Sequence, residues 1–153
     1  MANVNHSTLT DPYLHEPKGA AAATAGKVYV ANGSGSGAWT ARQDTFIVHF
    51  SDISTASSLY VPIPFAGTVT KVQSVLSGSI SGSDAVFTIS DSGGSSMGTL
   101  TITQSGSAAG DIDTLAPSSN NTVTASDYIQ IACDGGPSSH VNTLIVVVVD
   151  RSS

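Results

Sequence analysis

From residue 43 onward the chain consists of short runs in which apolar residues alternate with serine, threonine and other residues. Along the first run, Phe46, Val48 and Phe50 would point to one side, and Ile47 and His49 to the other. This two-residue period is that of a β-strand with one buried face, because successive side chains of a strand point in opposite directions. No segment repeats apolar residues at the spacing of an amphipathic helix. The pattern therefore predicts an all-β fold.

Segments with this period recur between turns rich in Gly, Pro, Asn and Asp. We expect strands over residues 44–50, 59–64, 68–76, 85–90, 99–103, 112–115, 122–124, 128–133 and 143–149. About eight short strands with frequent turn signals are typical of an antiparallel β-sandwich. A two-sheet jelly roll is the natural architecture at this number of strands.

Three of these segments carry further information. The strand over residues 143–149 is apolar on both faces, so we expect it to be central in a sheet or to lie in a subunit interface. Val69 and Val72 fall out of phase with each other, which predicts a bulge. Pro62 and Pro64 indicate a sheet edge or a strand end, because proline cannot donate to a β-ladder.

Residues 1–42 differ from this pattern, and we interpret them as an extended attachment arm that precedes a β-sandwich, jelly-roll-like domain over residues 43–153. Pro12 and Pro17 disfavour a helix between them. A short apolar strand, residues 27–30, and a glycine-rich turn follow. The aromatic residues Tyr13, Tyr29 and Trp39 either pack back on the domain or are buried in a partner, where Tyr and Trp are favoured anchors. An extended peptide of this kind suits addition along a partner surface.

The distribution of charged and apolar residues argues against nucleic acid and membrane as partners. The net charge is −6, and the five Lys and Arg residues never cluster, so we expect no nucleic-acid binding. The longest apolar run, residues 144–149, is far too short to span a membrane. The N-terminus lacks the basic and apolar regions of a signal peptide, so we expect synthesis in a cytoplasm.

Candidate catalytic and metal-binding patterns are weak. Residues 94–98 match a nucleophile-elbow motif, but a strand rather than a helix follows them, so we predict a hairpin turn. The four histidines have no metal-ligand spacing, and Asp111 and Asp113 are interpreted as solvated loop carboxylates rather than a cation site. Cys133 lies in an apolar strand pattern and is expected to be buried. We expect no enzymatic activity, cofactor or metal.

Several stretches of the chain are similar in sequence to segments of one protein family. The sequence reads Asp-Pro-Tyr-Leu-His-Glu-Pro-Lys-Gly-Ala over residues 11–20, Ala-Gly-Lys-Val-Tyr-Val over 25–30, and Gly-Ser-Gly-Ala-Trp over 35–39. These segments resemble the N-terminal arm of tailed-bacteriophage head decoration proteins, also called cement or head-fibre proteins. Residues 61–72 and 120–127 are similar to the β domains of that family.

The resemblance implies a virion structural protein without catalytic activity. It would sit as a homotrimer on the outer surface of the capsid, bind the major capsid protein through its arm and reinforce the shell. By match to the arm motif, the implied capsid-binding residues are Pro12, Tyr13, Leu14, His15, Glu16, Pro17, Tyr29 and Trp39.

The alternative is a receptor- or glycan-binding tail-fibre or head-fibre module, with a host-surface glycan as partner. Jelly rolls are common lectin scaffolds. The predicted loops over residues 77–83, 91–96 and 134–139 contain no aromatic residue on which a sugar could stack, which favours the capsid interpretation. A hydrolase acting on a host surface polymer is a third, less supported interpretation.

Overall fold

The computed structural model describes residues 23, 26–34 and 37–151, and its regular structure is entirely β-strand. No helix in this part of the chain has the length and apolar character to cross a membrane. The strands are β1 (Lys27–Ala31), β2 (Gly37–Ala41), β3 (Gln43–Phe50), β4 (Ser57–Pro62), β5 (Gly67–Leu76), β6 (Ala85–Ser90), β7 (Ser96–Ile102), β8 (Thr114–Leu115), β9 (Thr122–Val123), β10 (Tyr128–Cys133) and β11 (Thr143–Arg151).

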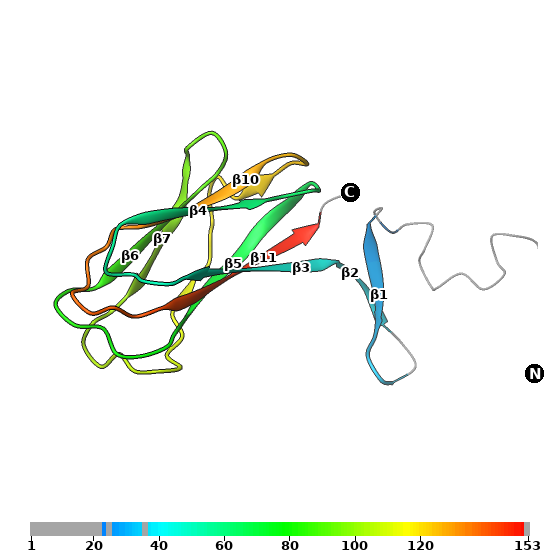
Figure 1. Ribbon diagram of the computed structural model, residues 1–153. Coiled ribbons are helices and arrows are strands. Elements are labelled where there is room, and N and C mark those ends of the chain that lie inside the picture. The colour runs from blue at the N-terminus through cyan, green and yellow to red at the C-terminus, as the bar shows by residue number, and fades with distance from the viewer. Residues whose placement is uncertain (1–22, 24–25, 35–36, 152–153) are drawn as a thin grey trace, which may run out of the picture.

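Nine of these strands, β3 to β11, form two sheets packed as two layers, and β1 and β2 form a separate hairpin (Figure 1). The five-stranded sheet has the order β3-β11-β5-β8, with β9 also paired to β5, and the four-stranded sheet has the order β4-β10-β6-β7. Every pairing is antiparallel. The predicted all-β antiparallel sandwich is confirmed.

The chain changes sheet at most connections. Strands β3, β4, β5 and β6 alternate between the five-stranded and the four-stranded sheet, and β10 and β11 again lie in opposite sheets. These strand orders are compatible with the narrower prediction of a jelly roll, which stays an interpretation of the connectivity. The division into an arm and a domain near residue 42 likewise stays a prediction.

The core lies between the two sheets and is built from their inward-facing residues. Phe50 of β3 and Phe87 of β6 join the layers through a T-shaped contact, with ring centroids 5.1 Å apart. Cys133 is buried as predicted, with its Sγ atom 3.6 Å from the Ile53 carbonyl oxygen. Burial of each large aliphatic side chain contributes roughly 1.5–3 kcal/mol. The largest fully buried side chains are Phe87, Ile53, Ile63, Ile89, Leu100, Ile102, Ile129, Ile131, Ile145, Val69, Val72 and Val123.

The three strand-specific predictions agree with the structure. β11 is central, between β3 and β5. The register of β5 against β11 shifts between Val148 and Val149, where Lys71 pairs with Val148 but Val69 pairs with Val149. This bulge allows Val69 and Val72 both to be fully buried. β4, which ends at Pro62, is one of the two edge strands of the four-stranded sheet.

Candidate functional site

The β1–β2 hairpin brings together two of the residues that the sequence implicated in capsid binding. Tyr29 and Trp39 are direct cross-strand partners. Their ring centroids lie 5.4 Å apart at an interplanar angle of 64°, an edge-to-face arrangement. Aromatic pairs of this geometry contribute about 0.5–1.5 kcal/mol beyond the area they bury. The other implicated residues, Pro12 to Pro17, lie outside the described residues.

Local sequence explains how this hairpin forms. The Asn32 Oδ1 atom accepts a hydrogen bond from the Ser34 backbone N–H at 2.9 Å, and Gly33 has a φ of 76°, a left-handed conformation that glycine adopts easily. At Gly37 a side chain could not fit, because a Cβ atom there would lie 2.8 Å from the Tyr29 ring. The Tyr29 ring therefore lies over a position that only glycine can occupy.

The opposite face of the hairpin is apolar and open. Val28 and Val30 are 42% and 51% exposed, and they pair with Thr40 and Ala38 on the same face. A hollow lies between this valine face and the start of β3, and Asp150 of β11 also lines it. The described residues therefore leave both faces of the hairpin at least partly exposed.

The hairpin projects from one end of the sandwich (Figure 1). Its exit is fixed there, because the Arg151 backbone N–H donates to the Arg42 carbonyl oxygen at 2.8 Å. The Arg151 guanidinium also donates to the Asp44 carboxylate, which lowers the pKa of Asp44, and lies 3.8 Å from the centroid of the Phe65 ring. An isolated two-stranded hairpin is at best marginally stable in water. A partner that covers its aromatic or valine face would therefore stabilise it.

A short apolar stripe crosses the outer side of the five-stranded sheet, where His49, Gln73 and Lys71 lie beside it. The outward residues of β11 are Leu144, Val146 and Val148, of which Leu144 is exposed. Val146 pairs with the exposed Ile47 of β3, and Leu144 pairs with Val75 of β5. The prediction that β11 is a central strand is therefore confirmed, and no described residue covers its outer side.

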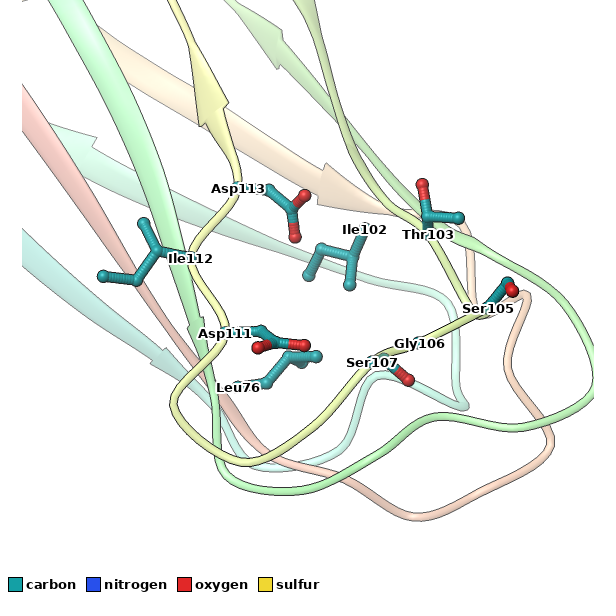
Figure 2. A pocket seen from close by; sticks show the side chains of 9 residues that line it. All are labelled: Leu76, Ile102, Thr103, Ser105, Gly106, Ser107, Asp111, Ile112 and Asp113. Atoms are coloured by element: carbon teal, nitrogen blue, oxygen red, sulfur yellow. The ribbon is translucent and has the colours of Figure 1, made fainter.

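A polar pocket of about 190 Å³ contains Asp111 and Asp113 (Figure 2). Asp113 points toward Ile102, while Ile112 points away from the pocket. Burial, and secondarily the charge of Asp111, raises the pKa of Asp113. The Asp111 carboxylate accepts a hydrogen bond from the Ala108 N–H at 2.6 Å. Among the described residues, no group of three or more His, Cys, Asp or Glu side chains is placed to hold a metal ion.

A hydrogen-bonded cluster of Asp52, Ser54 and His140 joins two loops that are far apart in the chain. The sequence did not predict this cluster. The His140 Nδ1 atom lies 2.8 Å from Asp52 Oδ2 and 3.4 Å from Ser54 Oγ, and Ser54 Oγ also donates to Asp52 at 2.8 Å. In a catalytic triad, serine and aspartate contact opposite nitrogens of the imidazole. Here both contact the same nitrogen, so the cluster holds two loops together. An aspartate two residues before a serine in a loop was its only local sequence signal.

Comparisons with known proteins bear on the fold. No protein-family model and no curated protein matches the sequence. A chain from the acid-stable capsid of Helicobacter pylori bacteriophage KHP30 is structurally similar, with a TM-score of 0.50 and 12% identity over 83% of this chain and 94% of that one. Weaker likenesses are to a chain of the cyanophage Pam1 capsid (TM-score 0.47, 13% identity, 99% and 100% covered) and to Bacillus endospore appendages that form disulfide-linked pili (0.41, 15%, 74% and 90%). At this level of identity, the KHP30 chain shares its fold with the present protein.

Proposed function

We propose that the protein is a structural component of a phage virion that decorates the outer surface of the capsid and binds the major capsid protein through its N-terminal arm. The observation that carries the proposal is the β1–β2 hairpin. It presents an aromatic pair on one face and two half-exposed valines on the other, and it stands apart from a sandwich that has its own core. Such a surface gains stability when a partner covers it.

Two further observations support this proposal. Residues 11–39, which include β1 and the first three residues of β2, carry the resemblance to the arms of head decoration proteins. The chain from the KHP30 capsid shares the fold, so a sandwich of this architecture occurs in a phage capsid. We propose that residues 12–17 dock as an extended peptide beside the hairpin, with Tyr29 and Trp39 as anchors.

We further propose that the protein forms a homotrimer through the outer side of the five-stranded sheet. Leu144, Val146 and Ile47 form an apolar stripe across β11 and β3. Apolar patches of this kind on a sandwich mark surfaces that a second protein covers. Three copies can bring this stripe together around a three-fold axis, and such an assembly requires no further partner.

The proposal assigns no catalytic role to the protein. The Asp52, Ser54 and His140 cluster lacks the two-sided imidazole contact that proton transfer in a triad requires. Structural reinforcement needs no reacting group, and the fixed loops of this cluster serve stability instead.

The test compares three forms of the protein for binding to expanded capsids that lack it: the full chain, a truncation without residues 1–42, and a Tyr29→Ser/Trp39→Ser double variant. We expect both altered forms to stay folded and neither to cosediment with capsids. Undiminished capsid binding by the truncation would overturn the proposal. A control variant, Ile112→Ala, changes an exposed apolar residue away from the hairpin and should bind as the full chain does.

A further inference from the structure

The outer face of the four-stranded sheet carries an exposed pair of tyrosines. Tyr60 of β4 is 57% exposed and Tyr128 of β10 is 39% exposed. Their ring centroids lie 5.3 Å apart, and the ring planes meet at 82°. The two rings therefore form an aromatic corner open to solvent, with one ring presenting its face beside the edge of the other.

Hydrogen bonds hold both rings in place. The Gln130 Nε2 atom donates to Tyr60 Oη and to Ser58 Oγ, each at 3.4 Å, and Tyr128 Oη donates to the Ser92 carbonyl oxygen at 3.4 Å. Rigid aromatic rings with a few fixed polar groups beside them offer a ligand both stacking area and hydrogen bonds. These contacts arrange the corner before any ligand arrives, which lowers the entropic cost of binding.

The rest of this sheet face is uncharged. Strands β4, β6, β7 and β10 all lie in the described part of the chain and contain no charged residue. Gln130 lies opposite both Tyr60 and Ser90, and Thr88 lies opposite Thr99 and Ala132, so amide, hydroxyl and small apolar side chains surround the rings. Because only 10% of the chain is charged, the exposed rings rather than the missing charges set this face apart.

The border of this face is acidic. Asp84, Asp91, Asp127 and Asp134 lie in the loops directly before or after β6 and β10. The described lysines and arginines lie elsewhere, on β1, β5 and β11 and between β2 and β3. An anionic ligand would be repelled at this border. A cationic one would find no carboxylate on the face itself, and the border carboxylates already accept hydrogen bonds from backbone N–H groups. The charge distribution thus selects a neutral ligand.

From these observations we infer that the outer face of the four-stranded sheet binds a neutral glycan. A sugar ring stacks on Tyr60 or Tyr128, and its hydroxyls exchange hydrogen bonds with Gln130 and the neighbouring Ser and Thr hydroxyls. The loops over residues 77–83, 91–96 and 134–139 contain no aromatic residue on which a sugar could stack. The pairing of β4 with β10 instead places two tyrosines together on the sheet. This binding is separate from attachment to the capsid and does not depend on it.

The test measures binding of the full-length protein to an array of neutral and acidic oligosaccharides. Calorimetric titration then follows with the neutral oligosaccharides that bind on the array. We expect binding to neutral glycans only. The Tyr60→Ala/Tyr128→Ala double variant should bind about tenfold more weakly or worse, because truncating central aromatic anchors typically costs more than one factor of ten. The Tyr60→Phe/Tyr128→Phe variant keeps the rings and should retain most of the affinity.

Control variants and a second readout keep the result unambiguous. Ile112→Ala, on an exposed residue outside this sheet, should bind glycan normally, and amide chemical-shift changes on titration should centre on Tyr60, Gln130 and Tyr128. The Tyr60→Ala/Tyr128→Ala variant should still bind capsids, which separates this site from the hairpin. Failure of the full chain to bind any neutral glycan, preference for acidic glycans, or a loss of oligomer mass in the tyrosine variant would each overturn the inference.

Discussion

Two aspartates in loops have pKa values that are displaced in opposite directions. The pKa of Asp52 is lowered to about 2, first by the Ser54 backbone N–H, then by the Ser54 hydroxyl and by His140. The pKa of Asp113 is raised, chiefly because burial disfavours its charged form. The first carboxylate therefore stabilises the fold when it is ionised, and the second destabilises it.

The Asp113→Asn variant should be more stable than the parent at neutral pH. Its amide removes a charge that the native pocket disfavours, so we expect the melting temperature at pH 7 to rise by about 1–3 °C. At about pH 3 the carboxyl is protonated in both states, and the difference should disappear. Thermal unfolding followed by circular dichroism at both pH values measures this. An unchanged or lower melting temperature at pH 7 would contradict the assigned cost of burial.

The Asp52 contacts predict a loss of stability in acid. A carboxylate with a lowered pKa in the folded state contributes stability above its ordinary pKa of 3.8, and this stability is lost as the pH falls from about 4 to about 2. The Asp52→Ala variant lacks the contribution and should show a smaller decline in melting temperature across this window. Parallel declines in the two proteins would show that Asp52 does not stabilise the loops.

At the scale of elements, the sequence predicts strands where apolar residues alternate or form a short run, and it gives no signal elsewhere. Residues 27–30 form a short apolar run and fold as β1, but the partner strand β2, Gly37–Ala41, has small residues on both sides of Trp39 and gives no such pattern. The Asn32–Gly33 turn sets the register that places Trp39 opposite Tyr29. The Tyr29–Trp39 contact depends on how the two strands pair. The sequence could therefore mark both residues as candidates but could not predict that they touch.

Gly37 should control the packing of the hairpin aromatics. A valine at this position would collide with the Tyr29 ring and the facing backbone, so Gly37→Val should displace Tyr29 from Trp39. Trp39 is the single tryptophan of the chain, and its fluorescence should shift to longer wavelength while the melting temperature of the sandwich stays the same. Gly78→Ala, where a Cβ atom would meet nothing within 4 Å, should leave the emission unchanged. An unshifted spectrum for Gly37→Val would contradict the described packing.

At the scale of the whole molecule, the two-residue period was sufficient to predict a sandwich, because one buried face per strand requires two sheets that cover each other. The same period says nothing about which outward residues become neighbours. Tyr60 and Tyr128 are far apart in the sequence and meet only because β4 pairs with β10. Surfaces that form through the pairing of distant strands could therefore not be predicted from the sequence.

The uncovered side of the five-stranded sheet yields a prediction for the assembly. Val146 lies at the middle of the outer side of β11, opposite Ile47. A charge buried in an apolar interface without a partner is strongly unfavourable, so Val146→Lys should convert the proposed homotrimer to a monomer and leave the fold intact. Light scattering gives the mass, and Thr101→Lys on the other sheet is the control. A parent protein that is itself monomeric at micromolar concentration would refute this interface.

We propose that the N-terminal end of the chain fastens the protein to a capsid while the sandwich faces outward. An image of a capsid carrying this protein, at a resolution that separates the hairpin from the sandwich, tests this arrangement most directly. We expect density for Tyr29 and Trp39 against the capsid shell, with the four-stranded sheet exposed to solvent. Density showing the sandwich flat against the shell and the hairpin pointing away from it would contradict this arrangement.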